Sequence, residues 1–382
     1  MVLFITAILA MITPCFGTSR ASRGQVVQSK TFDVNKGGTL EVSIGVGDII
    51  VGAWQKNQVS IQASGIDPDE SQRLSMEQIG NTVRVTYRPE WGGGARVRFQ
   101  INVPSEFNTD LHTSGGDIQL QGAFRGKLEG STSGGDINLS NVDGQVEMST
   151  SGGDIEAGTI NGTCTLHTSG GDIHVQTSGG QVELVTSGGD ITIGNVGKSL
   201  TARTSGGDIS VGDVGGELNA GTAGGDIDVG KVSGNATLKT AGGNIQLRGG
   251  NGTIKAKTAG GDVSLENISG SVEASTAGGD VEAELRPSGS GRSRLSSSGG
   301  DITLYLPDSA KATIDALIDV RGHWKSMSSE YEIVSDFKAR TFEKDEDAKE
   351  IHGIYVLNGG GEEISLETVN GNIYVRSARN KQ

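Results

Sequence analysis

The sequence is poor in aromatic residues, proline and cysteine. Only 4% of its 382 residues are Phe, Trp or Tyr, the side chains that fill a thick core, so a large conventional α/β domain is not expected. Six prolines beside 62 glycines exclude collagen, which needs glycine at every third position. Hydrophobic residues still make up 34%, which favours a turn-rich folded chain over a disordered one.

The chain also lacks an excess of basic residues. Its formal net charge of −14 argues against nucleic acid or an anionic membrane as the partner. A cation or a basic surface is compatible with this charge, and so is a self-repelling, soluble exterior with no specific partner.

Long hydrophobic runs are missing after the amino terminus. Residues 1–21 begin with MVLFITAILAMITPCFG, which is too short to span a bilayer and predicts a secretory signal peptide cleaved after Gly17 or Ala21. The usual Lys or Arg before the apolar run is absent. The letters ITPC, ending at Cys15, suggest a lipoprotein box, with Pro14 where a small residue is wanted. We expect an exported protein in the periplasm, at the cell surface or outside the cell, with no integral membrane segment after cleavage.

A short unit recurs through most of the chain: Gly-Gly, then an acid or amide, then an aliphatic residue. From Asp136 to Asp280 its acid position recurs every eighteen residues. A fixed period this short predicts a solenoid, a stack of equivalent coils. The positions are Asp117, Asp136, Asp154, Asp172, Asp190, Asp208, Asp226, Asn244, Asp262, Asp280 and Asp301.

Each unit divides into two halves of nine residues, such as TSGGDIHVQ and KVSGNATLK. Ile173 and Val175 alternate with polar residues in a first half, and Val182 and Leu184 do so in a second half. Alternation over so short a span, bounded by glycine, predicts a short β-strand with one buried face. We expect the Gly-Gly pairs to supply the positive φ angles of sharp corners. One coil is therefore strand, turn, strand, turn.

A single coil of this kind is not stable by itself. Its few aliphatic side chains do not offset the entropy of ordering the backbone, so each coil must hydrogen-bond in register to coils about 4.8 Å away on either side. Strands of successive coils must be parallel, because the connection always runs the same way. A slip of one residue would turn the buried side chains outward. A third apolar file is expected at the narrow end of the coil, at Val142, Ile160, Val196, Val214, Val232 and Ile268.

The two flanks are less regular and are predicted to cap the stack. Residues 30–110 are richer in aromatics, and the other flank contains a charged insert, EKDEDAKE, and an echo of the repeat, VNGNIYV. Open solenoid ends expose strand edges that invite aggregation, so atypical ends are expected. We predict an all-β, single-chain parallel β-solenoid (a β-helix or β-roll), with 18-residue coils of two short strands over 111–306 and irregular β caps over 30–110 and 307–382.

The recurring SGGDI unit, the opening GTLEVSIGVGDIIVGAW followed by INVP, and the closing GEEISLETVNGNIYV resemble the bacterial putative-adhesin family of unknown function. The related head-domain family named for its Gly-Ile-Asn signature is similar. The resemblance covers roughly residues 30–378 and implies an exported, envelope-associated protein. It carries no catalytic residues to transfer. The number and regularity of the coils depart from the family pattern.

The row of aspartates has two interpretations. In the first, each Asp accepts backbone N–H bonds from its own tight turn. In the second, Ca²⁺ ions lie between coils, as in nine-residue repeats that read Gly-Gly-x-Gly-x-Asp. Here the third glycine is absent and the opposite corner is chemically mixed, so we expect no metal or cofactor. The alternative calcium ladder comprises Asp136, Asp154, Asp172, Asp190, Asp208, Asp226, Asp262 and Asp280.

Three other features are weaker candidates. A ladder of threonines from Thr132 to Thr276 forms one column beside the glycine corner, whereas ice-binding faces use two. His167 and His174 lack a third metal ligand and are interpreted as solvated surface residues. Cys164 occupies an aliphatic slot and is expected to be an inert buried thiol. It is the only thiol left if Cys15 leaves with the signal peptide, so no intramolecular disulfide is expected.

No catalytic arrangement stands out, and no loop interrupts residues 117–280, so we expect no enzyme. We predict an adhesin or cell-envelope surface protein that makes many weak contacts through ladders of Thr, Ser and Asp. Its partner would be a glycan or protein ligand on a surface, or an envelope component, and not nucleic acid. The alternatives are a Ca²⁺-binding β-roll and an envelope scaffold or regulator that binds a protein.

Overall fold

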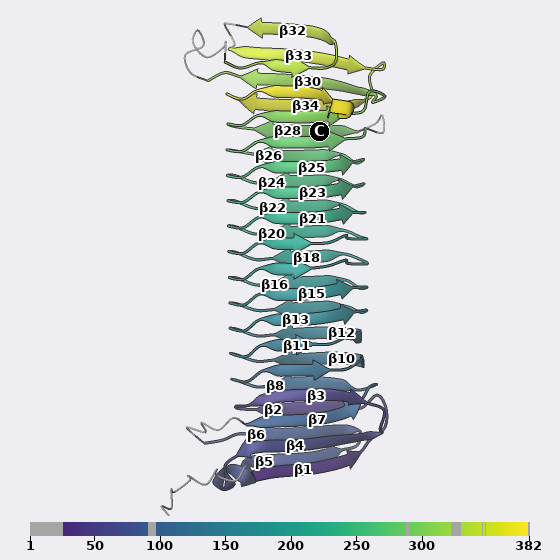
Figure 1. Ribbon diagram of the computed structural model, residues 1–382, viewed down its shortest axis with the longest axis vertical. Coiled ribbons are helices and arrows are strands. Elements are labelled where there is room, and N and C mark those ends of the chain that lie inside the picture. The colour runs from purple at the N-terminus through teal and green to yellow at the C-terminus, as the bar shows by residue number, and fades with distance from the viewer. Residues whose placement is uncertain are drawn as a thin grey trace, which may run out of the picture.

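The computed structural model describes residues 26–90, 97–287, 291–321, 330–345, 347 and 349–380. The predicted signal peptide and Cys15 lie outside these residues. The described chain forms a tall stack of β-coils with almost no helix (Figure 1). No helix among the described residues is long and apolar enough to cross a membrane.

Two walls of short strands make the central stack, and each coil contributes one strand to each wall. Wall A consists of β8 (Asn108–His112), β10 (Phe124–Ser131), β12 (Val142–Ser149), β14 (Cys164–His167), β16 (Val182–Val185), β18 (Leu200–Arg203), β20 (Leu218–Gly221), β22 (Ala236–Lys239), β24 (Ile254–Lys257), β26 (Val272–Thr276) and β28 (Arg292–Ser297). Wall B consists of β9 (Ile118–Gln121), β11 (Ile137–Leu139), β13 (Ile155–Ile160), β15 (Ile173–Ser178), β17 (Ile191–Ile193), β19 (Ile209–Val211), β21 (Ile227–Val232), β23 (Ile245–Gly250), β25 (Val263–Ile268), β27 (Val281–Leu285) and β29 (Ile302–Leu306).

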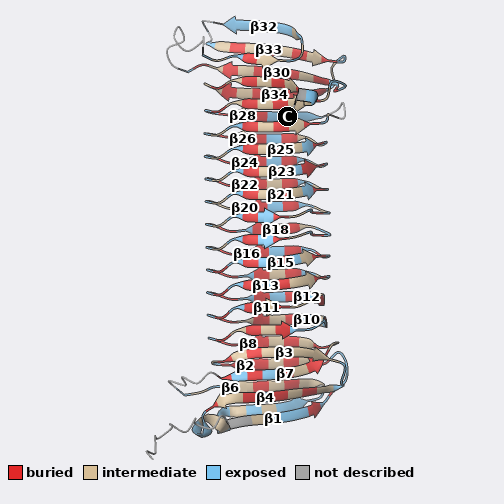
Figure 2. Cartoon of the chain, viewed as in Figure 1, coloured by how far each residue is buried: buried red, intermediate tan, exposed pale blue. Residues whose placement is uncertain are grey.

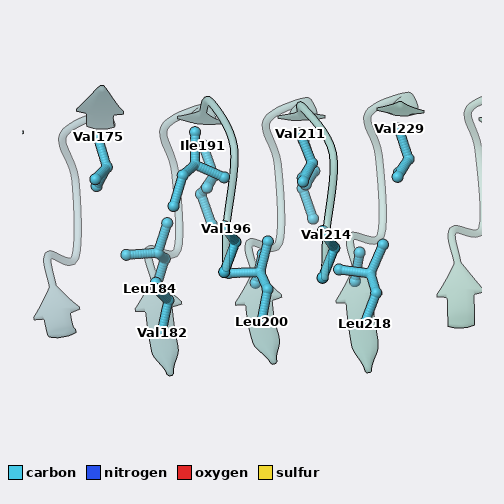
Figure 3. Close-up of a cluster of buried hydrophobic side chains, with 14 of the residues drawn as sticks. Val175, Val182, Leu184, Ile191, Val196, Leu200, Val211, Val214, Leu218 and Val229 are labelled. Atoms are coloured by element: carbon cyan, nitrogen blue, oxygen red, sulfur yellow. The ribbon is translucent and has the colours of Figure 1, made fainter. Parts of the chain in front are cut away.

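The strands of successive coils are parallel, and equivalent residues of the repeat pair with one another, as predicted. Ile173 pairs with Ile191, and Ile191 pairs with Ile209, so these side chains form one file along the axis. Val182 pairs with Leu200 in the facing wall. Figure 3 shows the two sets pointing at each other across the interior of the coil. Aliphatic ladders from two walls therefore form one continuous core.

The predicted third apolar file is confirmed. Its members are buried and pair from coil to coil at the corner that follows wall B. Ser178 and Gly250 also stand in this file. A side chain at Gly250 would meet the Cδ1 of Ile254, which lies 2.8 Å from the position of its Cβ. The file thus tolerates small residues where a neighbouring side chain fills the space.

The role predicted for the Gly-Gly corners is wrong in the repeats. Every described glycine with φ in the left-handed region lies at or before Gly126 or at or after Gly291. The corner glycines are needed because the coils stack closely. A Cβ at Gly153 would collide with the carbonyl oxygen of Gly135 in the preceding coil, whereas a Cβ at Gly152 would lie 3.7 Å from its nearest neighbour. At this corner only the second glycine is sterically required.

At the amino-terminal end the strands stack out of chain order. The coil formed by β2 (Thr39–Ile44) and β3 (Asp48–Trp54) pairs with β8 and β9 on one side, and with β6 (Thr82–Tyr87) and β7 (Arg98–Pro104) on the other. Antiparallel strands then close the stack: β4 (Gln58–Ile66) on β7, β1 (Val26–Asp33) on β4, and β5 (Leu74–Ile79) on β6, after the short helix η1 (Pro68–Arg73).

The carboxyl-terminal end uses the same device. β34 (Glu362–Val369) and β35 (Ile373–Ser377) stack in parallel on β28 and β29, so the echo VNGNIYV does form a coil in register. Outside this coil lie β30 (Ala312–Asp319), β31 (Ile333–Ser335), β33 (Glu350–Leu357) and β32 (Ala339–Asp345), the last two antiparallel, and the chain ends in η2 (Ala378–Asn380). Parallel stacking therefore extends past residues 111–306 at both ends, and the division into caps and solenoid stays a prediction.

Burial alternates along nearly every strand, with one side chain inside and the next outside (Figure 2). The largest buried side chains, Phe99, Phe107 and Phe124, lie near the amino-terminal end, and the hydrophobic core of the central coils from β11 to β27 consists of aliphatic residues, Met148 and Cys164. The outermost strand β32 is exposed along most of its length and rich in charge. Charged edge strands discourage pairing with another chain.

Candidate functional site

The aspartate row is a hydrogen-bonded ladder between coils. The Oδ1 of Asp190 accepts the backbone N–H of Asp208 at 2.8 Å, and the Oδ1 of Asp172 accepts that of Asp190 at the same distance. The acceptor role was predicted, but the donor belongs to the next coil and not to the residue's own turn. The physical reason is the stacking distance, which brings a carboxylate within reach of the amide above it.

The ladder continues beyond the repeats. It runs through Asp48, Asp117, Asp136, Asp154, Asp172, Asp190, Asp208, Asp226, Asn244, Asp262, Asp280, Asp301 and Asn372, and ends at the N–H of Glu332. Sequence spacing did not reveal Asp48, because its coil precedes the repeats in the chain and becomes their neighbour only in the stack. The ladder joins the caps to the central coils.

The calcium alternative stays a hypothesis. In the part of the chain that the structure describes, no three His, Cys, Asp or Glu side chains are grouped so that they could hold a metal ion. The acidic row is interrupted at Asn244, whose Oδ1 accepts the N–H of Asp262 at 2.8 Å just as an aspartate does in the other coils. The structural role of the ladder therefore needs no charge.

The threonine ladder is internal, which corrects its predicted place on the binding surface. The hydroxyl of Thr168 donates to the carbonyl of Gly153 in the preceding coil at 2.8 Å and accepts the N–H of Gly171 at 3.3 Å. Thr168 is 5% exposed, and the threonines of the neighbouring coils are equally or nearly as buried. Hydroxyls bound in this way cannot present an ice-binding face.

The histidines and the cysteine lie apart. His167 is on wall A and His174 is on wall B, and both are exposed, so the structure does not bring them together. Cys164 is buried in wall A and pairs in register with Val146 and Val182. Burial raises the pKa of its thiol to about 12. A thiol that stays protonated inside an aliphatic file is a poor nucleophile, in agreement with the inert role expected for it.

A shallow groove runs across four coils of wall B near the amino-terminal end. We call it the amide groove, and its volume is about 590 Å³. It exists because Gly158 carries no side chain in a row where neighbouring coils carry Gln121, Ser140 and Gln176. Its lining is Gln119, Leu120, Gln121, Asn138, Leu139, Ser140, Glu156, Ala157, Gly158, His174 and Gln176.

The chemistry of the amide groove is that of a hydrogen-bonding surface. Amide groups of Gln and Asn both donate and accept, and the rows place such groups one coil apart along the groove. Gln121 already donates to the Oε1 of Gln119 at 3.4 Å. Leu120 and Leu139 also line the groove, but their side chains are buried in the core, so the outward groups are the polar ones. Sequence reasoning missed the groove because it followed buried positions, although aligning the outward positions coil by coil would have shown the amide cluster.

A second groove of about 460 Å³ lies on wall A and is acidic. Asp110, Glu129 and Glu147 stand in one outward row there, beside a row that holds His112 and His167. His112 lies 2.7 Å from Asp110, and Lys127 pairs with Glu129. These local pairs reduce the repulsion within the acidic row.

Residues 194–376 match the family described as Toastrack DUF4097. This part of the chain is a Toastrack domain. The resemblance expected from the SGGDI units and the closing VNGNIYV is therefore confirmed, and the family has no established function. No curated protein matches the chain in sequence.

Several of the solved structures that are similar to this chain carry adhesin names. One is a putative cell adhesion protein from Clostridium sporogenes, with 12% identity, 93% of this chain and 100% of that chain covered, and a TM-score of 0.19. A putative adhesin from Bacteroides fragilis has 13% identity, coverages of 92% and 97%, and a TM-score of 0.17. A putative adhesin from Parabacteroides merdae has 10% identity, coverages of 91% and 95%, and a TM-score of 0.25.

Proposed function

We propose that this protein is an exported, non-enzymatic surface or cell-envelope adhesin that binds its ligand through outward polar rows. The amide groove carries the proposal. Four successive coils place amide, hydroxyl and imidazole groups around the gap at Gly158, on a rigid wall and in straight rows. A glycan or a protein backbone offers hydroxyl or amide groups that match such donors and acceptors.

A binding role fits the groove better than catalysis does. Glycoside hydrolysis needs two carboxyl groups that flank the bond, and the groove contains one, Glu156. Glu156 and its neighbour in the next coil, His174, are both exposed to water. Catalytic acids and bases work best where burial and neighbouring groups adjust their pKa and exclude water.

The repeated geometry supports weak contacts made many times. A rigid solenoid holds its outward rows in a fixed arrangement, so a multivalent ligand that binds one coil is presented to the next without a further loss of translational freedom. The threonine hydroxyls have no part in this, because they bond inside the coil. The outward Gln, Asn, Ser and His side chains are the contact groups.

The test uses purified mature protein on a glycan array and on whole cells, together with cell fractionation. The double variant Asn138→Ala/Gln176→Ala removes two amides from the groove. The control Gln181→Ala/Asn219→Ala removes two exposed amides elsewhere on the solenoid. We expect the groove variant to lose roughly tenfold in affinity for the ligand found, and the control to bind like the wild type.

Two results would contradict the exported adhesive role. If cell fractionation finds the protein in the cytoplasm, the proposed export is contradicted. Binding to no glycan and no cell surface, with the protein held in the periplasm, would favour the envelope scaffold or regulator in place of the adhesin. Hydrolysis of a glycan that depends on Glu156 would show an enzyme instead.

A further inference from the structure

The outward charges of wall A are sorted along the solenoid axis. Its lower coils carry mainly acids, with Lys127 paired to Glu129 among them, and the coils from β18 to β24 carry cations. The acids are Asp110, Glu129, Glu147 and Glu183, and the cations are Arg203, Lys239, Lys255 and Lys257. Between Glu183 and Glu273 the wall A strands carry no outward acid, and Glu217 stands directly before β20, at the opposite end of that strand from Gly221. In a chain of net charge −14, this is a local reversal of sign.

Register places the cations in nearly one line. Arg203 pairs with Gly221, Gly221 pairs with Lys239, and Lys239 pairs with Lys257. Lys255 stands beside this file on the same strand as Lys257. We call these four cations the basic row. It spans three coil steps, or about 14 Å at the usual strand spacing.

The cations of the basic row are exposed and largely unpaired. Lys255 lies 3.6 Å from Glu273. Arg203, Lys239 and Lys257 have no ion pair with any residue in the described parts of the chain. Like charges directly opposite on neighbouring strands destabilise a sheet, so Lys239 beside Lys257 is an unfavourable pair unless an anion bridges it. Gly221 leaves room between Arg203 and Lys239 for such a group.

The shape and chemistry of the basic row select among polyanions. Duplex DNA carries one charge per about 1.7 Å of axis, roughly twice what four cations over this length would match. Single-stranded nucleic acids need aromatic stacking platforms, and the strands from β18 to β24 contain no aromatic residue. A planar anionic membrane would bring Glu183 and Glu273 against it as well. A narrow polyanion with widely spaced charges matches the charge density, needs no aromatic platform and does not contact the flanking acids.

We infer that the basic row binds a linear acidic polysaccharide, whose carboxylates lie along the solenoid axis over Arg203, Lys239 and Lys257. This inference rests on the proposed adhesive function and names a ligand class for a second surface, on the wall opposite the amide groove. Lysine contributes a point charge and arginine a planar guanidinium to successive carboxylates, so binding is multivalent and weakened by salt.

The experiment measures binding of polygalacturonate oligosaccharides to the full mature chain by calorimetry. Lys239→Glu/Lys257→Glu reverses two charges in the basic row, and Lys198→Glu/Lys231→Glu makes the same change in net charge at exposed lysines outside it. We expect the first variant to lose at least tenfold in affinity and the second to bind within about threefold of the wild type. Wild-type affinity should fall roughly tenfold between about 50 and 200 mM salt. Highly methyl-esterified pectin, which has the same backbone without the charge, should not bind.

The alternatives give different results. Equal losses in both lysine variants would show a general charge effect and overturn the inference. Stronger binding to phosphatidylglycerol vesicles or to single-stranded DNA than to polygalacturonate would assign the row to another partner. Salt-sensitive dimers abolished by Lys239→Glu/Lys257→Glu would assign it to a second copy of the chain. Lys239→Gln/Lys257→Gln repeats the test without placing two acids side by side.

The inference and the proposed function can fail separately. Loss of polygalacturonate binding in the basic-row variant, with cell binding through the amide groove intact, supports the inference. Absence of polygalacturonate binding by the wild type, with cell binding intact, overturns the inference alone.

Discussion

The ends of the solenoid and its central coils use glycine for different purposes. In the ends, glycines such as Gly37, Gly80 and Gly359 adopt positive φ angles that other residues resist. In the central coils the second glycine of each corner pair has no such angle, yet a Cβ there would strike the carbonyl of the coil before it. Turns that close a sheet need conformational freedom, whereas turns that repeat along a stack need close approach.

The two regions also differ in how strands follow one another. Each central coil pairs with the next coil in the chain, so the ladder could continue without limit. At both ends a coil is inserted out of order and antiparallel strands follow it. Antiparallel strands carry a different hydrogen-bond pattern and different side chains, so they end the repeat and discourage end-to-end association.

The largest expected effect separates the two glycines of one corner. Gly153→Ala should lower the free energy of unfolding by about 3 kcal/mol or prevent folding, because its Cβ meets backbone that cannot move without shifting a coil. Gly152→Ala should change it by less than about 1 kcal/mol. Chemical denaturation measures both. Equal effects would mean that close stacking is not the reason for the second glycine.

The threonine ladder gives the next effect. Thr168→Val keeps the shape of the side chain but removes the hydroxyl between Gly153 and Gly171, which should cost about 2 kcal/mol because buried backbone groups lose a partner. Thr192→Val, at an exposed position of wall B, should stay within about 0.5 kcal/mol. Similar denaturation midpoints for the two variants would show that the ladder does not stabilise the coils.

A glycine of the amino-terminal end should respond differently from Gly153. Gly80 has φ +63° and open space around its Cβ position, so Gly80→Ala should cost about 1 kcal/mol through backbone strain alone. Gly80→Asn should cost less, because Asn adopts left-handed angles more readily. Gly153→Asn should cost as much stability as Gly153→Ala or more, because the obstacle at Gly153 is the neighbouring backbone and not the φ angle. If Gly153→Asn were more stable than Gly153→Ala, the two regions would not differ in their use of glycine.

The aspartate ladder should tolerate loss of charge. Asp190→Asn keeps the acceptor for the N–H of Asp208 and should leave the free energy of unfolding within about 0.5 kcal/mol, while Asp190→Ala should cost about 1 kcal/mol. Melting curves with and without Ca²⁺ provide the second measurement. A large loss in Asp190→Asn, or a melting point that collapses in chelator, would favour the calcium ladder.

Much of the central fold could be predicted from particular residues. The spacing of Ile173, Ile191 and Ile209 predicted their single file, and the alternation around Val182 and Leu184 predicted which face is buried. The candidate site could not be predicted in the same way. The amide groove depends on residues from four coils and on the missing side chain of Gly158, which matter only once the register has placed them side by side.

The sequence by itself determined the period, the buried ladders and the parallel register, because each repeat must place its aliphatic residues over those of the last. Tertiary structure alone decided the direction of the aspartate bonds, the burial of the threonines and the place of Asp48 and Asn372 in the ladder. These depend on atoms from different coils that come within hydrogen-bonding distance only when the stack is built, and on end strands whose spatial order departs from their order in the chain.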